Sequence, residues 1–454
     1  ALPIYRLSPT DTELCNSYNM IRLTQLLFYI QPRAEYAEYA ERVLFNHILA
    51  AQHPADGRIC YFTPLAPGCA RRYETLYDGF TCCTCSSLDS YSKHAEFIYA
   101  HDANALYVNL FAASEVNWRE KGVSIRQDTK FPDEDAARFT IACGQPTDFT
   151  LYLRCPVWSV DGTSISLNGE RQNVAARSGG YASIKRVWND GDNVELRFPM
   201  SLRMEAMPDN PKKIAFFYGP ILLAAPVDEA NDDVLPPALV PTAEKPLADA
   251  IVPVQGKSLE FTMTGVAKPN DLPMMPFFRL HDRPYVVYWD VMSEADYAKR
   301  QEENAARIAE REALNARTAD SVKIGDDASE SAHAMKGENT QSGFGAYGQH
   351  MKTRWRHAGS GGYFSYELAV LPGQPNALRC TYWGKETGSR TFDILVNGIA
   401  VATQTLDSNH PSEFYNVETQ IPAELTKDAF KITVTFKPHD GNTAGGLFGI
   451  RTVK

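Results

Sequence analysis

The chain has 454 residues, of which 44% are hydrophobic and 22% are charged, and its formal net charge is −10. This ordinary globular composition leaves room for about two to four domains. Because the chain is acidic and contains no basic block, nucleic acid and acidic membrane surfaces are poor partners. No apolar run reaches the roughly 18 residues of a membrane-spanning helix, so we expect no membrane span. The composition does not define an oligomeric state.

The N-terminal part of the chain predicts helices around a cysteine-rich loop. Apolar residues recur at helical spacing over 10–31 and again over 34–52, where acidic residues fill the first half. The wide apolar arc of the first pattern predicts a helix buried on more than one side. A further helix is predicted over 88–99, after a Pro- and Gly-rich stretch with a short strand over 59–62. We define 1–102 as the helical part of the chain.

From residue 103 onward the hydrophobic pattern changes from helical spacing to a period of two. Many short strands with regularly spaced turn signals predict a β-sandwich over 103–226. Residues 227–317 are expected to connect this part to the next. They contain a Pro-, Ala- and Asp-rich stretch over 227–270 that is expected to run over the surface, then an aromatic strand pair. A charged, solvated helix is predicted over 293–314.

Strands return over 318–454 and predict a second, C-terminal β-domain of jelly-roll type. Jelly rolls include lectin-like domains that bind sugars, but a purely structural role agrees equally well with the sequence. The chain as a whole is therefore predicted to be a mixed α and β, multidomain protein.

Cysteine usage distinguishes the helical part from the rest of the chain. Nine cysteines are present, and six of them fall within the first 85 residues. An odd number with this clustering argues against a disulfide-stapled scaffold and favours metal or thiolate chemistry. The adjacent Cys82 and Cys83 rarely bridge each other, because a disulfide needs Cα atoms about 4.4–6.8 Å apart. From a loop, however, both can face one metal ion. Cys143, Cys155 and Cys380 lie in apolar, strand-like runs and are interpreted as buried hydrophobic residues.

Glu13 and Cys15 are candidate partners for this cysteine pair. Zinc accepts thiolates and carboxylates at the corners of a tetrahedron. Residues two apart can share a metal only in or just before the first turn of a helix, where the possible capping box at 10–13 places them. In one alternative, Glu13 is only a capping residue and Cys15 a core thiol. In another, Cys82 and Cys85 form a redox dithiol.

A series of sequence motifs, which includes the candidate ligands, is spread along most of the chain. The chain reads Thr-Glu-Leu-Cys-Asn-Ser-Tyr-Asn-Met at 12–20 and Phe-Thr-Cys-Cys at 80–83. Further segments lie at 41–49, 61–65, 106–111, 153–158, 186–192, 218–220, 354–356 and 392–396. In their order along the chain they resemble glycoside hydrolase family 127 and its close relatives, such as family 146. Several motifs in one order are far more specific than any single motif.

The resemblance implies a retaining β-L-arabinofuranosidase with a zinc-bound cysteine nucleophile, acting on oligosaccharides or polysaccharides that contain L-arabinofuranose. Carried over by position, Cys82 is the implied nucleophile and Tyr61 lines the implied sugar subsite. The implied ligands of Zn²⁺ are Glu13, Cys15, Cys82 and Cys83. Degradation of such glycans favours a periplasmic or secreted location. The alternative function is a non-catalytic carbohydrate-binding or structural protein that works through its two β-domains.

This sequence lacks some features of the family, and their absence affects the activity that we expect. The family's catalytic domain is an (α/α)6 barrel, and the helices predicted over 1–102 resemble only its C-terminal members. The family's glutamate acid/base lies farther upstream of the Glu-x-Cys motif than this sequence extends before Glu13. We therefore expect the C-terminal portion of a larger enzyme, incomplete or inactive by itself, with the acid/base residue missing. The residues that follow Cys83 also differ from the family's turn.

Overall fold

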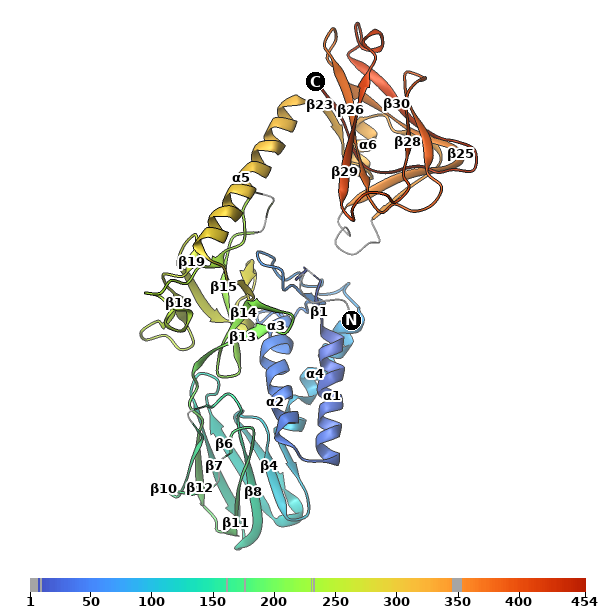
Figure 1. Cartoon of the computed structure of the whole chain (residues 1–454). Helices are drawn as coiled ribbons and strands as arrows, with labels where there is room; N and C mark the ends of the chain where they lie inside the picture. The colour runs from blue at the N-terminus through green and yellow to red at the C-terminus, as the bar shows by residue number, and fades with distance from the viewer. Residues whose placement is uncertain are drawn as a thin grey trace. The chain divides into compact units, whose positions relative to one another are not determined.

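The computed structural model describes residues 7–8, 10–160, 162–174, 177–229, 231, 233–344 and 353–454. The chain divides into two compact units, Ala1–Asn304 and Ala305–Lys454. They run from blue to yellow and from orange to red in Figure 1. Each unit has a hydrophobic core of its own. The mixed α and β character predicted from the sequence is confirmed, and strands far outnumber helices among the described residues.

The described helices of the helical part are α1 (Leu14–Ile30), α2 (Ala34–Val43), α3 (Leu49–Ala51) and α4 (Cys82–Lys93). A π-helical turn (Leu44–Ile48) joins α2 to α3, and α1 and α2 lie side by side (Figure 1). The helix predicted over 88–99 instead begins at Cys82, because Thr81 caps it by accepting the backbone N–H of Thr84 at 3.4 Å. The (α/α)6 barrel implied by the resemblance stays a prediction, since α1 to α4 are the helices described in this part.

Helix α1 is buried on one side only. It buries Leu14, Thr24, Gln25 and Phe28. Leu23, Leu26 and Ile30 are exposed, and Ile30 is 82% exposed. The expectation that this helix is buried on more than one side is therefore wrong for the described chain, in which no neighbouring element covers the second apolar face.

The β-sandwich follows the helices. Its strands are β3 (Tyr99–His101), β4 (Ala105–Val108), β5 (Ser114–Trp118), β6 (Val123–Thr129), β7 (Ala136–Cys143), β8 (Thr147–Cys155), β9 (Ser164–Leu167), β10 (Glu170–Arg171), β11 (Gly180–Trp188) and β12 (Asn193–Arg197). They form a four-stranded sheet, β11-β8-β4-β3, and a six-stranded sheet, β10-β9-β12-β7-β6-β5. Within β8, Phe149, Leu151 and Leu153 alternate with less buried residues and pack in one core with Trp188. This alternation is the reason that a sandwich forms. The predicted end of the sandwich at residue 226 is wrong, because the strands over 202–226 pair in a separate sheet.

A second group of strands follows the sandwich. They are β13 (Leu202–Met207), β14 (Asn210–Tyr218), β15 (Ile221–Pro226), β16 (Ala238–Leu239), β17 (Ile251–Pro253), β18 (Phe261–Met263), β19 (Ala267–Lys268), β20 (Leu272–Pro276), β21 (Tyr285–Val286) and β22 (Trp289–Asp290). The main path is β13-β14-β15-β20-β18-β17, which we call the linker sheet. The surface course expected for 227–270 is wrong, because this stretch contributes strands and buries Leu239, Met263 and Val266 in a common core. Strands of two or three residues are too short to show an alternating pattern.

Helix α5 (Glu294–Arg317) buries none of its residues, which confirms the predicted solvated helix. The C-terminal unit contains α6 (Asp327–Ala332) and the strands β23 (Thr318–Val322), β24 (Lys336–Phe344), β25 (Arg354–Ala369), β26 (Asn376–Trp383), β27 (Thr391–Val396), β28 (Ile399–Thr405), β29 (Phe414–Ile421), β30 (Lys431–Pro438) and β31 (Ala444–Val453). These strands form one continuous nine-stranded sheet that curls around a single core (Figure 1). Strands are thus present where the sequence predicted a C-terminal β-domain, and its jelly-roll type stays a prediction. None of the described helices combines the length and the apolar character needed to span a membrane.

A buried polar network fixes α2 to the sandwich. Arg154 Nη1 lies 2.7 Å from Glu38 Oε1, and its Nη2 contacts the Glu41 carboxylate. Trp158 Nε1 donates to Glu41 Oε2 at 2.8 Å. The side chains of Arg154 and Glu41 are 0% and 1% exposed. Because α2 packs against α1, this network also sets the position of the helices that carry the site described next.

Candidate metal and thiolate site

Two short strands position the first pair of candidate ligands. β1 (Thr12–Glu13) pairs antiparallel with β2 (Phe62–Thr63), and Glu13 stands opposite Phe62. Glu13 therefore lies immediately before α1, and Cys15 lies in the first turn of that helix. The side chain of Glu13 makes no capping hydrogen bond. The alternative that Glu13 serves only as a capping residue is therefore wrong. Its carboxylate is left for another partner.

The adjacent cysteines occupy the first turn of α4, not a loop as the sequence suggested. Cys82 and Cys83 directly follow the capping residue Thr81. Glu74 accepts a hydrogen bond from Thr81 Oγ1 at 2.5 Å and another from Thr84 Oγ1. Glu74 thus holds the start of the helix that carries the cysteine pair. Sequence reasoning missed Glu74, for which the Thr-x-x-Thr spacing around the cysteines is the only local signal.

The four residues that the sequence predicts as metal ligands lie together. One ligand atom from each of Glu13, Cys15, Cys82 and Cys83 lies within 4.8 Å of the other three. The sulfurs of Cys15 and Cys83 are 3.3 Å apart. Among the residues that the structure describes, this is the single group of three or more His, Cys, Asp or Glu side chains that could hold a metal ion. We call it the thiolate cluster.

The thiolate cluster fits zinc. Zn–S bonds of about 2.3 Å in a tetrahedral site place two sulfurs about 3.8 Å apart, and the ligand atoms of the cluster are spaced within 4.8 Å. Three thiols and one carboxylate also match the ligand types that zinc prefers. Cys83 is buried, Cys15 is half-buried and Cys82 is exposed. The cluster is therefore accessible from solvent at Cys82.

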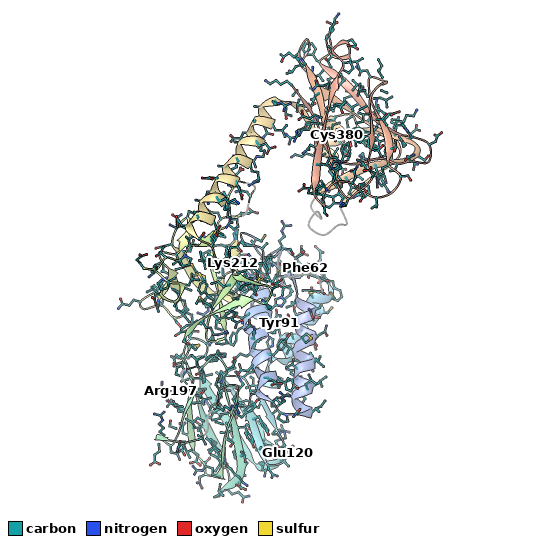
Figure 2. All side chains as sticks on the ribbon, viewed as in Figure 1. Phe62, Tyr91, Glu120, Arg197, Lys212 and Cys380 are labelled. Atoms are coloured by element: carbon teal, nitrogen blue, oxygen red, sulfur yellow. The ribbon has the colours of Figure 1, made fainter. Side chains whose placement is uncertain are left out.

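Tyr61, predicted from the sequence to line a sugar subsite, lies beside the cluster. Its hydroxyl is 3.4 Å from Cys82 Sγ and 3.4 Å from Glu13 Oε1. A tyrosine hydroxyl carries one proton, so it donates to one of these two atoms at a time. The exposed ring of Phe62, labelled in Figure 2, lies 4.5 Å from the Tyr61 ring between centroids. Ser86, which no sequence motif singled out, donates from Oγ to Cys15 Sγ at 3.3 Å.

Hydrogen bonding and burial distinguish the two adjacent thiols. The hydroxyl of Tyr61 and the thiol of Cys15 lower the pKa of Cys82. Burial raises the pKa of Cys83, and the hydrogen bond with Cys15 raises it further. Burial also raises the pKa of Cys15. Of these three thiols, Cys82 is both the most exposed and the most readily ionised.

Comparison with protein-family models covers the residues of this site. Residues 5–96 match a model described as Beta-L-arabinofuranosidase, GH127 catalytic domain. Residues 105–200 match one described as Beta-L-arabinofuranosidase, GH127 middle domain. Both models describe glycoside hydrolase family 127, and they match residues 5–96 and 105–200 of this chain. The family resemblance is thereby confirmed, and the whole thiolate cluster lies in the part that matches the family 127 catalytic domain.

Two further parts of the chain match models without an assigned role. Residues 235–291, which include most of the linker sheet after β15, match a domain of unknown function. Residues 313–453, which make up nearly all of the C-terminal unit, match a family of unknown function.

Relatives that match this chain are distant and longer. It is 24% identical over 250 residues to the non-reducing end β-L-arabinofuranosidase of Bifidobacterium longum subsp. longum, covering 49% of this chain and 37% of the relative. A solved glycoside hydrolase is 21% identical with a TM-score of 0.52, covering 62% of this chain and 53% of that one. The β-L-arabinofuranosidase Ara127N of Geobacillus stearothermophilus T6 is 22% identical with a TM-score of 0.49, covering 62% of this chain and 50% of that one. The chain thus spans about 37% of the curated relative and about half of each solved structure.

Proposed function

We propose that this chain carries the catalytic thiolate of a retaining β-L-arabinofuranosidase, with Cys82 as the nucleophile and Glu13, Cys15, Cys82 and Cys83 as zinc ligands. One observation supports the proposal above all others: three sulfurs and one carboxylate from two distant parts of the sequence lie within 4.8 Å of one another. The name of the curated relative favours L-arabinofuranose as the sugar. Because the chain spans 37% of that relative, the activity is proposed for the protein to which these residues belong.

Cys82 is assigned as the nucleophile for two reasons. Its side chain is exposed whereas Cys15 is half-buried and Cys83 is buried, so Cys82 is the thiol that can best meet a sugar directly. The Tyr61 hydroxyl, 3.4 Å away, stabilises the ionised sulfur by donating a hydrogen bond to it. Bound zinc supplies a positive charge that keeps coordinated thiols deprotonated at neutral pH. The half-buried ring of Tyr61 and the exposed ring of Phe62 provide a wall against which a sugar ring can lie.

The proposed reaction has two displacements at one carbon. First, the sulfur of Cys82 forms a bond to the anomeric carbon, while the bond from that carbon to the leaving oxygen breaks and the oxygen keeps the electron pair. Second, a water oxygen attacks the same carbon, the sulfur–carbon bond breaks and the thiolate is regenerated. Two inversions give net retention. The general acid/base of this scheme, expected from the sequence to be missing, is not assigned to any residue of this chain.

Metal analysis tests the ligand set without any need for turnover. We expect about one zinc per chain in the wild-type protein and in Cys85→Ser, which removes an exposed cysteine of α4 outside the cluster. Zinc affinity is expected to fall about tenfold or more in Cys15→Ser and Cys83→Ser, because each loses a ligand. Wild-type protein free of zinc, or equal zinc content in Cys83→Ser and Cys85→Ser, would refute the metal assignment.

Covalent labelling tests the nucleophile. p-Nitrophenyl β-L-arabinofuranoside suits this purpose, because p-nitrophenolate leaves as an anion and needs no general acid. After incubation, intact-mass measurement is expected to show one added arabinosyl group on the wild type and on Cys85→Ser, and none on Cys82→Ser. Peptide mapping is expected to place the group on Cys82. A label on another residue, or no label on zinc-containing wild-type protein, contradicts the assignment.

A further inference from the structure

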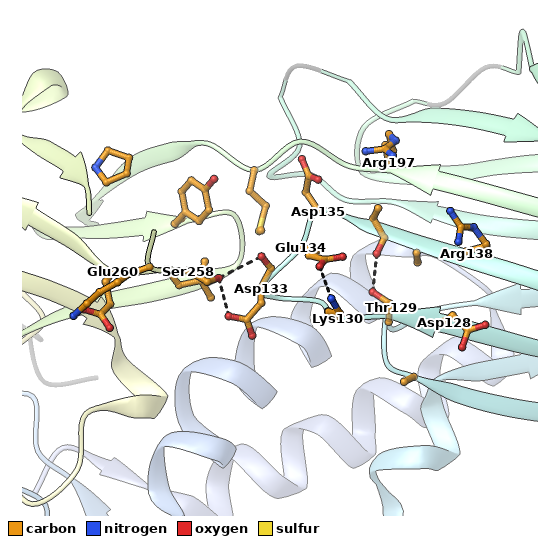
Figure 3. Close-up of a pocket in the computed structure, with 18 of the residues that line it drawn as sticks. Asp128, Thr129, Lys130, Asp133, Glu134, Asp135, Arg138, Arg197, Ser258 and Glu260 are labelled. Atoms are coloured by element: carbon orange, nitrogen blue, oxygen red, sulfur yellow. Dashed lines mark hydrogen bonds and ion pairs between the residues drawn. The ribbon is translucent and has the colours of Figure 1, made fainter. Parts of the chain in front are cut away.

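A cavity of about 890 Å³ lies away from the thiolate cluster, between the β-sandwich and the linker sheet. One wall is formed by residues 128–138, which end β6 and begin β7, and the other by residues 253–261 between β17 and β18 (Figure 3). Its volume lies within the range of about 300–1,000 Å³ typical of small-molecule sites. No residue of the thiolate cluster lines it. We call this cavity the sheet-junction groove.

Hydrogen bonds tie the two walls of the sheet-junction groove together. Ser258 Oγ, from the linker-sheet wall, donates to Asp133 Oδ1 at 2.8 Å (Figure 3). Arg279 Nη2 lies 2.7 Å from the other oxygen of Asp133 and lowers the pKa of that carboxyl group. Leu259, at the tip of the hairpin, has a positive φ of 58°, a conformation that bulky residues rarely adopt without a structural reason. The groove is therefore held open before any ligand arrives, which favours binding.

Two polar groups in the sheet-junction groove lack a protein partner. Within the described part of the chain, the carboxylate of Asp135 and the hydroxyl of Tyr218 make no hydrogen bond or ion pair. Both residues line the same cavity, and burial, followed by the charge of Asp135, raises the pKa of Tyr218. The Tyr218 ring packs against the Phe261 ring with centroids 5.2 Å apart. The groove thus combines an aromatic surface with an unpaired acceptor and an unpaired donor.

Charges of both signs line the sheet-junction groove, four cationic side chains and six carboxylates. The paired side chains are Lys130 with Glu134 at 3.0 Å, Arg197 with Glu195 at 2.6 Å, and Lys257 with Glu260 at 2.8 Å. Paired charges of both signs give no net attraction for phosphate, nucleic acid or an acidic polysaccharide. Among the described residues the groove also holds no group of metal-ligating side chains. An uncharged ligand with many hydroxyls fits best, because carboxylates accept, tyrosine and guanidinium groups donate, and an aromatic ring covers an apolar sugar face.

We propose that the sheet-junction groove binds a neutral oligosaccharide, with Asp135 and Tyr218 hydrogen-bonded to sugar hydroxyls and no bond cleaved. This binding site is separate from Cys82 and goes beyond the proposed hydrolysis. The groove would bind a part of the glycan that is remote from the bond to be cleaved. The assignment does not depend on whether Cys82 is a nucleophile.

Calorimetric titration of the full chain with neutral arabino-oligosaccharides tests this site. We expect saturable binding that is weakened about tenfold in Asp135→Ala and in Tyr218→Phe, because each loses a hydrogen bond to the ligand. Glu120→Gln is the matched control: Glu120 is an exposed carboxylate at the opposite end of the sandwich from Arg197 (Figure 2). It should bind as the wild type does, and so should Cys82→Ser.

Several outcomes overturn the groove assignment. The first is no saturable binding of the neutral oligosaccharide, and the second is unchanged affinity in both groove variants. Tighter binding of an oligogalacturonate of equal length overturns the neutral class of ligand. Loss of binding in Cys82→Ser assigns the ligand to the thiolate cluster instead and leaves the proposed hydrolysis standing. If Asp135→Ala fails to fold, Tyr218→Phe decides the test, because it keeps the ring that packs on Phe261.

Discussion

The sandwich and the helices beside it bury apolar residues in very different ways. In β8, Phe149, Leu151 and Leu153 are almost completely buried between two sheets. In α1, Leu26 and Ile30 are 58% and 82% exposed. A sandwich completes a core from its own two sheets, whereas a helix buries only the face that its neighbours cover. The helices that carry the thiolate cluster therefore depend on a few specific links to the sandwich.

Breaking the buried link between α2 and the sandwich is expected to have the largest effect. Arg154→Met leaves the carboxylates of Glu38 and Glu41 buried without their cation, which costs about 3–5 kcal/mol of unfolding free energy. Urea unfolding measures this loss, and hydrogen exchange should locate it in α2. Arg138→Met is the matched control, since Arg138 is exposed on the same sandwich and pairs with Glu195, so its loss should cost less than about 1 kcal/mol. Equal losses in the two variants would contradict the dependence of the helices on this link.

Acid is expected to weaken the helices more than the sandwich, through His47. Its ring is buried against Ser17 Oγ at 2.6 Å, and burial lowers its pKa from 6.5 to about 4. As the pH falls, His47 is therefore protonated in the unfolded chain at a higher pH than in the folded chain. The contribution of His47 to stability is constant above pH about 6.5 and falls between 6.5 and 4, by about 3 kcal/mol in all.

Urea midpoints at neutral and at mildly acidic pH measure this effect. His47→Gln should flatten the pH dependence over that range, whereas His101→Gln, at an exposed position in the sandwich, should not. A pH dependence that is the same in His47→Gln as in the wild type would show that another group is responsible.

A smaller effect is expected at the start of α4. Glu74→Ala removes the acceptor for the hydroxyls of Thr81 and Thr84, at a cost of about 1–3 kcal/mol. Because these residues position the cysteine pair, amide exchange at the first turn of α4 should accelerate and zinc affinity should fall. Asp78→Asn, in the same loop, has no comparable side-chain role and should change neither. Unchanged exchange in Glu74→Ala would remove Glu74 from the support of the thiolate cluster.

The smallest effect is expected on the exposed face of α1. Leu26→Gln should change the free energy of unfolding by less than about 0.5 kcal/mol, because Leu26 is already in contact with water. On the buried face of the same helix, Phe28→Ala should cost about 3–5 kcal/mol. Urea unfolding of the two variants compares the two faces directly. A large loss in Leu26→Gln would mean that this face is covered in solution.

Much of the fold could be predicted because its signals are local. The alternation of Phe149, Leu151 and Leu153 is visible in the sequence, and so is the alternating charge of α5. The start of α4 at Cys82 was missed, because the cap at Thr81 is itself held by Glu74 from outside the helix. The linker sheet was missed because its strands after β15 are only three to five residues long, too short to show an alternating pattern.

The candidate site could be predicted in its residues but not in its geometry. The sequence predicted the members of the thiolate cluster from two signals, the adjacency of Cys82 and Cys83 and the spacing of Glu13 and Cys15. The family resemblance supported the same four residues. Their approach within 4.8 Å depends on the pairing of β1 with β2, which no local pattern indicates. The sheet-junction groove had no sequence signal at all, because its walls come from segments more than a hundred residues apart.

Helix α5 has a practical consequence for anyone who recombines this chain. At its beginning, Arg300 donates to the Pro236 carbonyl of the N-terminal unit, and at its end Arg317 pairs with Glu418 of the C-terminal unit. Between these anchors the helix buries no side chain. Because the helix contributes no residue to either hydrophobic core, it is a natural splice point for exchanging one module while its neighbour is kept.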